Sequence, residues 1–154
     1  MTLQPGDHAP DFDLPSDGGG HVRLADFTGR TLVLYFYPKD DTSGCTSEAQ
    51  AFTAAAADFK AAGAAVVGVS KDSVKSHDKF KAKYELNFPL GSDADGAAVE
   101  AYGVWVEKSM YGRKYMGIER ATYLIDGSGR IAKVWRKVKV PGHAAEVLKA
   151  VKEA

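Results

Sequence analysis

The residue with the clearest chemical potential is Cys45, the only cysteine among the 154 residues of the chain. It follows a short polar segment, residues 39–44 with the sequence KDDTSG, and precedes a stretch in which apolar residues recur every three or four positions. That spacing predicts a helix, and Cys45 falls in its first turn. There the unpaired backbone N–H groups and the positive end of the helix dipole favour a thiolate over a thiol. The position therefore predicts a reactive sulfur.

A structural cysteine is the competing interpretation, because single cysteines often pack as small apolar side chains. The neighbours of Cys45 argue against it. Residues 40–44 and 46–47 are all polar or small, whereas a structural cysteine is expected among the apolar positions of a strand or helix. Position and neighbours together favour the reactive interpretation.

Spacing separates the known classes of cysteine chemistry. A dithiol oxidoreductase needs a second cysteine nearby, and the residue three positions after Cys45 is Glu48. A cysteine hydrolase needs a histidine base, and no sequence context singles out one of the four histidines. His77, on a predicted helix, is interpreted as a packing or surface residue; the others are His8, His21 and His143. No cluster of zinc ligands is present. What remains is a thiolate used alone, activated by its helix and a cation, that attacks a small electrophile.

Composition limits the other functions. Twenty basic and twenty acidic residues give a net charge of zero, so we expect no general attraction to nucleic acid or membranes. A hydrophobic content of 45% predicts one globular domain over residues 1–154. Residues 1–7 lack the features of a signal peptide, and no apolar run approaches the ~20 residues that span a bilayer. With a single cysteine, these features predict a cytoplasmic protein.

Cys45 must be positioned by the elements around it. Residues 31–37 form a continuous apolar run that predicts a strand buried on both faces, followed by a helix over residues 46–62. Residues 64–70 form a second apolar strand, so the three elements predict a parallel βαβ unit with a right-handed crossover.

The rest of the chain extends this unit. Residues 10–15 and 21–24 alternate around a glycine-rich turn and predict an N-terminal β-hairpin. A helix capped by Asp72 or Ser73 is predicted to end at Tyr84, and residues 107–117 are interpreted as an exposed connection. Residues 121–125 and 130–135 are predicted to form a hairpin, and a helix is predicted after Pro141 and Gly142. This order predicts an α/β fold of thioredoxin-like architecture, with a central mixed β-sheet flanked by helices.

Residues 37–48, YPKDDTSGCTSE, resemble the peroxidatic motif of the peroxiredoxins, Pro-x-x-x-Thr/Ser-x-x-Cys. The segment is most similar to the bacterioferritin comigratory protein, or peroxiredoxin Q, branch. Residues 68–73, 87–93 and 117–126 resemble further blocks of that branch in the same order, so the resemblance covers nearly the whole chain.

The resemblance implies a set of roles. Cys45 is expected to attack a peroxide oxygen and become a sulfenic acid, while Thr42 hydrogen-bonds the thiolate and the peroxide. Pro38 is expected to shield the thiolate from water, and Arg120 to supply the cation that favours it and to hold the polarised O–O bond. The backbone N–H groups of Gly44 and Cys45 are expected to help bind the peroxide. No metal, flavin or haem is implied.

The choice of arginine rests on the resemblance alone. The residues themselves leave Arg120, Arg113 and Arg136 as equal candidates for the activating cation. Glu48 is expected to orient Arg120 or another arginine, although a surface carboxylate at that helical position accounts for it almost as well.

Three positions depart from the family pattern. Many members carry a second, resolving cysteine where this chain has Gln50, and others carry it at a position that aligns with Lys81. An intramolecular disulfide is therefore impossible, which identifies a one-cysteine member. The family usually has proline where this chain has Ser43, and Ser43 is expected to be able to cap the helix instead.

The resemblance implies a thiol-dependent peroxidase that reduces hydrogen peroxide and small organic hydroperoxides, as a monomer or weak homodimer. Its reductant is an outside thiol: thioredoxin, glutaredoxin, glutathione or a second copy of the chain. The alternative is a thioredoxin-fold redox sensor or binding protein that is oxidised once without turnover. A third possibility is a purely structural cysteine.

Overall fold

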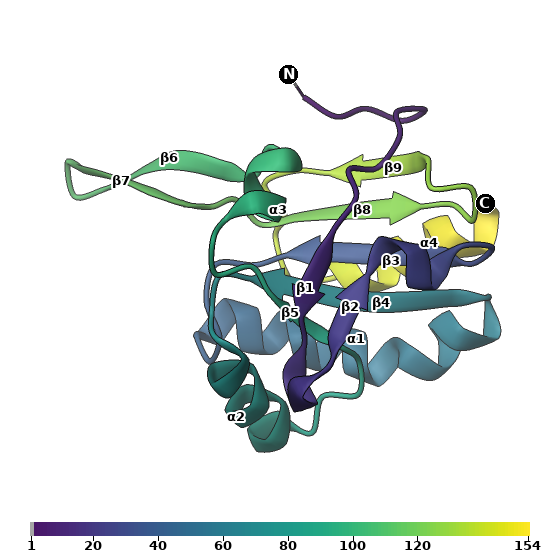
Figure 1. Cartoon of the computed structure of the whole chain (residues 1–154), viewed down its shortest axis with the longest axis horizontal. Coiled ribbons are helices and arrows are strands. Elements are labelled where there is room, and N and C mark those ends of the chain that lie inside the picture. Colours follow the sequence, from purple (N-terminus) through teal and green to yellow (C-terminus); the bar gives the residue numbers. More distant parts are fainter. Residues whose placement is uncertain (1) are drawn as a thin grey trace.

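The computed structural model describes residues 2–154, and its centre is a five-stranded mixed sheet ordered β5-β4-β3-β8-β9 (Figure 1). β3 pairs in parallel with β4 and antiparallel with β8, β5 extends the parallel side, and β9 extends the antiparallel side. The strands are β3 (Thr31–Phe36), β4 (Ala64–Ser70), β5 (Leu90–Ser92), β8 (Ala121–Ile125) and β9 (Ile131–Trp135). The predicted central mixed sheet and its βαβ unit are confirmed.

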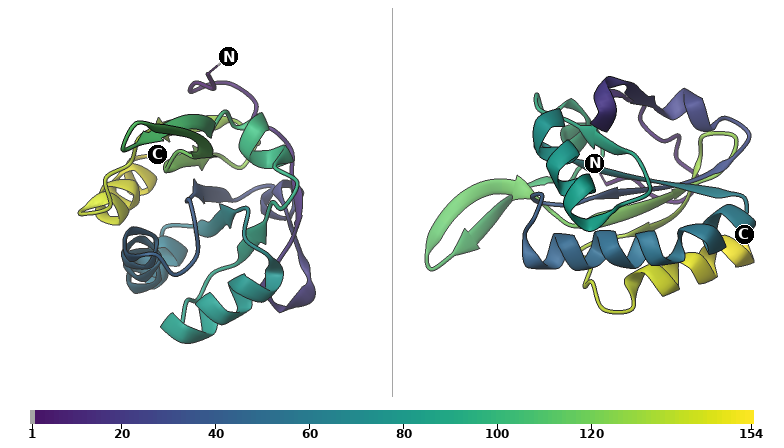
Figure 2. Two further views of the ribbon diagram at one scale, coloured as in Figure 1. Left: turned by 90° about the vertical axis from the view of Figure 1, so that its left-hand side faces the viewer. Right: turned by 90° about the horizontal axis from the view of Figure 1, so that it is seen from below.

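Helices cover both faces of this sheet. The long helix α1 (Ser43–Ala61) and the last helix α4 (His143–Glu153) run side by side on one face (Figure 2). The short helix α3 (Ala97–Ala101) and the predicted N-terminal hairpin of β1 (Asp13–Pro15) and β2 (His21–Arg23) lie on the other face (Figure 1). Helix α2 (Val74–Tyr84) packs beside β5, and two 3₁₀ turns complete the elements, η1 (Asp17–Gly19) and η2 (Leu24–Phe27). No helix in the described residues is long and apolar enough to cross a membrane.

Strand β3 explains why the fold has two apolar cores. Its side chains alternate between the faces of the sheet, and every residue from Leu32 to Phe36 is fully buried. Leu32, Leu34 and Phe36 belong to the hairpin-side cluster, which also contains residues of β1 and α3. Val33 and Tyr35 belong to the α1-side cluster, together with Cys45. A continuous apolar run is what a strand covered on both faces requires.

Residues 107–117 are mostly exposed, as predicted, but the prediction that they form a connection without regular structure was wrong. They form most of a second hairpin, β6 (Trp105–Met110) and β7 (Arg113–Ile118), which projects away from the central sheet (Figure 1). Its two turn residues, Tyr111 and Gly112, have φ values of 52° and 77°. In sequence, a two-residue turn with positive φ at both positions is usually marked by Asn-Gly or Asp-Gly, and this turn has neither. The exposed strands bury few side chains, so they do not require alternating apolar residues. Both usual signals of a hairpin are therefore missing.

Candidate active site

The candidate site lies where β3 ends and α1 begins. After Phe36 the chain forms a short loop, and α1 starts at Ser43, so Cys45 is the third residue of the helix. Thr42 occupies the N-cap position, and its carbonyl accepts a 2.8 Å hydrogen bond from the N–H of Thr46. The expectation that Ser43 caps the helix was wrong, because Ser43 already lies inside it. The sulfur of Cys45 is thus in the first helical turn, and the residue is only 1% exposed.

Arg120 joins the sulfur to a buried carboxylate. It sits between β7 and β8, and its Nη2 donates to the Sγ of Cys45 at 3.3 Å while its Nη1 donates to Oε1 of Glu48 at 2.6 Å. A Cβ at Gly44 would lie 3.2 Å from that Nη2, so the glycine leaves room for the guanidinium to approach the helix. One planar side chain therefore links Cys45 and Glu48, which stand one helical turn apart.

Burial controls the electrostatics of this group. Burial raises the pKa of Glu48 to about 7, although the charge and hydrogen bond of Arg120 oppose the shift. Burial by itself lowers the pKa of Arg120, but the charges of Glu48 and Cys45 outweigh it, so the pKa of Arg120 lies above its ordinary value. The second carboxylate oxygen of Glu48 is buried and has no hydrogen-bond partner among the described residues. Arg120 is therefore a permanent cation beside the sulfur.

The structure separates the three candidate arginines. Arg113 lies on the exposed part of the β6–β7 hairpin. Arg136 donates to Oε2 of Glu119 at 2.5 Å and to the carbonyl of Gly103 at 2.9 Å. Only Arg120 donates a hydrogen bond to Cys45 within residues 2–154.

The other predicted residues lie nearby with their own partners. The hydroxyl of Thr42 donates to the carbonyl of Lys39 at 2.9 Å, so that bond must break before the hydroxyl can donate to a thiolate. Pro38 is half-buried in the loop before α1 and lines a hollow beside it. Gly44 and Cys45 occupy the first turn, where backbone N–H groups lack helical partners.

In the part of the chain that the structure describes, no group of three or more His, Cys, Asp or Glu side chains is arranged to hold a metal ion.

A buried charged network fixes the loop before Cys45, and the sequence did not reveal it. His77 and Asp40 are 0% and 3% exposed, and His77 Nδ1 lies 2.7 Å from Oδ2 of Asp40. His77 Nε2 lies 3.0 Å from the carbonyl of Gly91, so both ring nitrogens face acceptors, which favours the charged ring with hydrogen on both nitrogens. Tyr37 donates to Asp40 Oδ1 at 2.5 Å, and the backbone N–H of Asp40 donates to Asp72 at 2.8 Å. These bonds tie the loop to α2.

The sequence carried little information about this network. His77 was interpreted as a packing or surface residue, and it is fully buried. Asp40 and His77 are 37 positions apart, and only the packing of α2 beside β5 brings them together.

Removing His77 is expected to destabilise the protein strongly. Replacing His77 by leucine leaves the carboxylate of Asp40 buried without its cation, a change that costs about 3–5 kcal/mol. Burial alone lowers the pKa of His77, but the hydrogen bond and charge of Asp40 outweigh it, so its folded pKa lies above the ordinary 6.5. Its contribution is therefore fully present below about pH 6.5 and is lost as the pH rises through the folded-state pKa. Urea unfolding at several pH values measures both effects.

His21 provides the matched control for this measurement. It also pairs with an aspartate, since its Nδ1 lies 2.7 Å from Oδ1 of Asp13, but the two side chains are 48% and 53% exposed. Replacing His21 by leucine is expected to leave the urea midpoint close to that of the wild type, because water screens an exposed pair. Equal losses in the two variants would contradict a special contribution from the buried pair.

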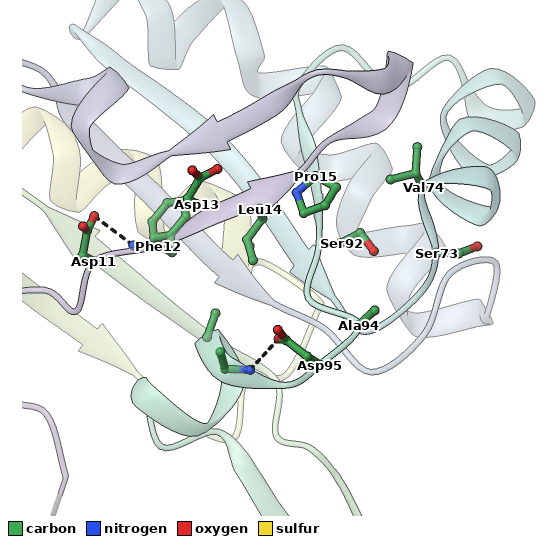
Figure 3. A pocket seen from close by; sticks show the side chains of 12 residues that line it. Asp11, Phe12, Asp13, Leu14, Pro15, Ser73, Val74, Ser92, Ala94 and Asp95 are labelled. Atoms are coloured by element: carbon green, nitrogen blue, oxygen red, sulfur yellow. Dashed lines mark hydrogen bonds between the residues drawn. The ribbon is translucent and has the colours of Figure 1, made fainter.

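A hollow of about 500 Å³ lies elsewhere on the molecule, between β1, the start of α2 and α3 (Figure 3). Its lining residues Phe12, Leu14 and Ala98 belong to the hairpin-side cluster, whereas Cys45 belongs to the α1-side cluster. The carboxylate of Asp95 in its wall accepts from the backbone N–H of Ala97 at 3.1 Å. The hollow lies across the sheet from the sulfur and belongs to a different part of the molecule.

Comparison with known proteins found similarity over nearly the whole chain. The family model described as "AhpC/TSA family" matches residues 5–134. A putative peroxiredoxin bcp of Coxiella burnetii is 53% identical over 148 residues, which cover 96% of this chain and 98% of that protein. Peroxiredoxin Bcp of Bacillus subtilis is 48% identical over 153 residues, which cover 99% of this chain and 98% of that protein.

A solved structure agrees in fold. It is that of the bacterioferritin comigratory protein of Xanthomonas campestris, studied for its alkyl peroxide reduction activity. Its TM-score is 0.90 at 48% identity, and the match covers 98% of this chain and 96% of that one. Structures of Xanthomonas campestris peroxiredoxin Q include two cysteine-to-serine variants at different positions, so that protein has at least two cysteines. The separation of the two positions equals that between Cys45 and Lys81, where this chain has no second sulfur.

Proposed function

Because this chain belongs to the AhpC/TSA family and is a thiol-dependent peroxidase, we propose that it reduces hydrogen peroxide and small organic hydroperoxides through Cys45. The observation that carries the assignment to this residue is the 3.3 Å contact between Arg120 Nη2 and the sulfur of Cys45 at the first turn of α1. A helix N-terminus and a fixed guanidinium on one sulfur favour the thiolate, which is the nucleophilic form.

The peroxide step is a displacement at oxygen. The thiolate of Cys45 attacks one oxygen of the peroxide, an S–O bond forms, and the O–O bond breaks. Cys45 is oxidised to a sulfenic acid, and the leaving alkoxide or hydroxide takes a proton and departs as an alcohol or water. Arg120 has five N–H donors, and those not engaged with Glu48 and Cys45 are free to hold the charge that develops on the departing oxygen.

The neighbouring residues fit the remaining parts of this step. The backbone N–H groups of Gly44 and Cys45 stand at the end of the helix that attracts a partly negative oxygen. Thr42 contributes its hydroxyl once the bond to Lys39 is released, and Pro38 limits the access of water from the loop side.

Recovery of the thiol requires a reductant from outside the chain. A first thiol attacks the sulfenic acid to form a mixed disulfide and water, and a second thiol releases the thiolate of Cys45. With one cysteine in 154 residues, both thiols come from other molecules. Thioredoxin, glutaredoxin and glutathione have the required chemistry.

Turnover tests this function against the redox-sensor alternative, which the single buried cysteine favours. The reduced protein is mixed with one equivalent of hydrogen peroxide and a sulfenic-acid trap, and a single trapped adduct on Cys45 is expected by intact mass. With a thioredoxin system, a glutaredoxin system or glutathione, the protein is expected to consume many equivalents of peroxide. Consumption of one equivalent with every reductant would establish the sensor, and no adduct would remove both proposals.

A monomeric or weakly dimeric state and a cytoplasmic location stay predictions from the sequence, as does the single-domain organisation of residues 1–154.

A further inference from the structure

The β6–β7 hairpin carries all the large apolar side chains that are exposed within the described residues: Met110, Tyr111, Tyr115 and Met116. The hairpin tip, residues 110–114 with the sequence MYGRK, is the outermost part, and Met110 and Tyr111 are 56% and 98% exposed. The hairpin projects from the body of the molecule, and six residues in each strand place the tip about 20 Å from its base (Figure 1). Tyrosine, methionine and arginine are enriched in protein–protein interfaces, so the tip has the composition of a contact surface.

The hairpin tip is also positively charged. Within residues 2–154, the side chain of Arg113 forms no ion pair and no hydrogen bond. Lys114 has only a loose pair with Glu107, at 3.7 Å, and its side chain is 77% exposed. Water screens such a pair, so both cations remain available to a partner. The tip therefore joins two apolar side chains to two cations.

The hollow of about 500 Å³ between β1, the start of α2 and α3 has the opposite charge (Figure 3). Its apolar lining includes Phe12 and Leu14, its charged lining residues are all aspartates, and no lysine or arginine lines it. Asp13 is already paired with His21 and Arg23. The other two carboxylates, Asp11 and Asp95, form no ion pair among the described residues and accept only from nearby backbone N–H groups.

We propose that the hairpin tip of one copy of this chain docks into the 500 Å³ hollow of a second copy, with Tyr111 on the apolar lining and Arg113 and Lys114 beside Asp11 and Asp95. The volume of the hollow is sufficient for an aromatic side chain and its neighbours. The tip points away from its own body, so its occupant site is on another molecule (Figure 1). The chain has no net charge, so opposite local charges can bring two copies together without general repulsion.

This contact joins two different surfaces, and two reciprocal contacts close a dimer. A tip of five residues buries little area, so the association is weak and depends on protein concentration. It does not depend on the peroxidase function, since neither surface contains Cys45.

Sedimentation of the protein at increasing concentration tests the association. The weight-average mass of the wild type is expected to rise above that of one chain. Replacing Tyr111 by asparagine is expected to raise the dissociation constant at least about tenfold, because the ring that fills the hollow is lost. Asn-Gly is a favoured pair for a turn with positive φ at both positions, so the hairpin itself is preserved. A wild type that is monomeric at every concentration, or a variant that associates as strongly as the wild type, would overturn the proposal.

A charge exchange tests the pairing of the two surfaces. The hairpin variant Arg113→Glu/Lys114→Glu and the hollow variant Asp11→Lys/Asp95→Lys each place like charges on both surfaces, so each alone is expected to stay monomeric. In an equimolar mixture, each tip meets a hollow of opposite charge, and association is expected to return to the wild-type level. Absence of this recovery would contradict the proposed pairing.

Lys149 is the control position, because it lies on α4, is 78% exposed and belongs to neither surface. The Lys149→Glu variant is expected to associate like the wild type. If the wild type stays monomeric and the Tyr111→Asn variant instead loses turnover only with a protein reductant, the tip docks the reductant and the proposal of a second copy is wrong.

Discussion

Replacing Cys45 by serine is expected to lower the rate of peroxide consumption by at least about a thousandfold. A serine hydroxyl is not ionised near neutral pH and is a far weaker nucleophile than a thiolate, so the attack on the O–O bond is lost. The measurement is the rate of hydrogen peroxide loss with saturating external thiol, together with the mass of the protein after peroxide treatment. The variant is expected to show no addition of oxygen and no trapped adduct at position 45.

The substitution is well suited to this purpose because it changes little else. Cys45 is 1% exposed and makes a hydrogen bond from Arg120 that a serine oxygen can also accept. The variant is therefore expected to unfold in urea close to the wild-type midpoint. A folded Cys45→Ser protein that still consumes peroxide at the wild-type rate would move the reactive centre to another residue.

Replacing Arg120 by methionine is expected to slow the oxidation of Cys45 by about 10²–10³-fold. The substitution removes the only hydrogen bond that the structure shows on the sulfur within residues 2–154. It also removes the cation that we propose stabilises both the thiolate and the departing oxygen. Two measurements report these effects separately. The rate of alkylation of Cys45 near neutral pH follows the thiolate fraction, and the second-order rate constant with hydrogen peroxide includes the stabilisation of the departing oxygen.

Arg136 is the matched control, because it also holds a half-buried carboxylate. Its pair with Glu119 is 27% and 14% exposed, against 16% and 2% for Arg120 and Glu48. Replacing Arg136 by methionine is expected to lower stability and to leave the alkylation and oxidation of Cys45 close to wild type. Equal loss of rate in the two variants would show that disturbance of the fold, not the contact with sulfur, causes the effect. The double variant Arg120→Met/Glu48→Gln is expected to recover stability but not the rate, since it removes the stranded carboxylate.

The fold was largely predictable because its signals are local. The apolar run that became β3 and the three-and-four spacing that became α1 each depend on neighbouring residues, and the parallel pairing of β3 with β4 follows from the βαβ unit. The β6–β7 hairpin was missed because its turn uses Tyr111 and because an exposed ribbon needs no alternation of apolar residues. Short β5 was likewise too brief to predict.

In the candidate site, too, the features with local sequence signals could be predicted and the long-range contacts could not. The position of Cys45 in the first turn of a helix could be predicted from its own surroundings, because local spacing predicts that helix. The cation could not be chosen from the residues, because Arg120 is 75 positions from Cys45 and several arginines look alike in sequence. The pairing of Asp40 with His77 could not be predicted either, because the two residues are 37 positions apart in the sequence. Long-range pairs depend on tertiary packing, which short sequence patterns do not encode.

The burial of Cys45 affects which form of the protein, reduced or oxidised, is expected to accumulate. A peroxide is small enough to reach a sulfur that is 1% exposed, whereas a reducing thiol must bring its own sulfur within bonding distance of the same atom. Asp40 also ties the loop before α1 to His77 of α2, which holds that loop in place. With Cys45 as the proposed peroxide-reactive residue, access is expected to favour oxidation over reduction. Under a steady supply of peroxide, we expect most of the protein to be oxidised and the reduction step to limit turnover.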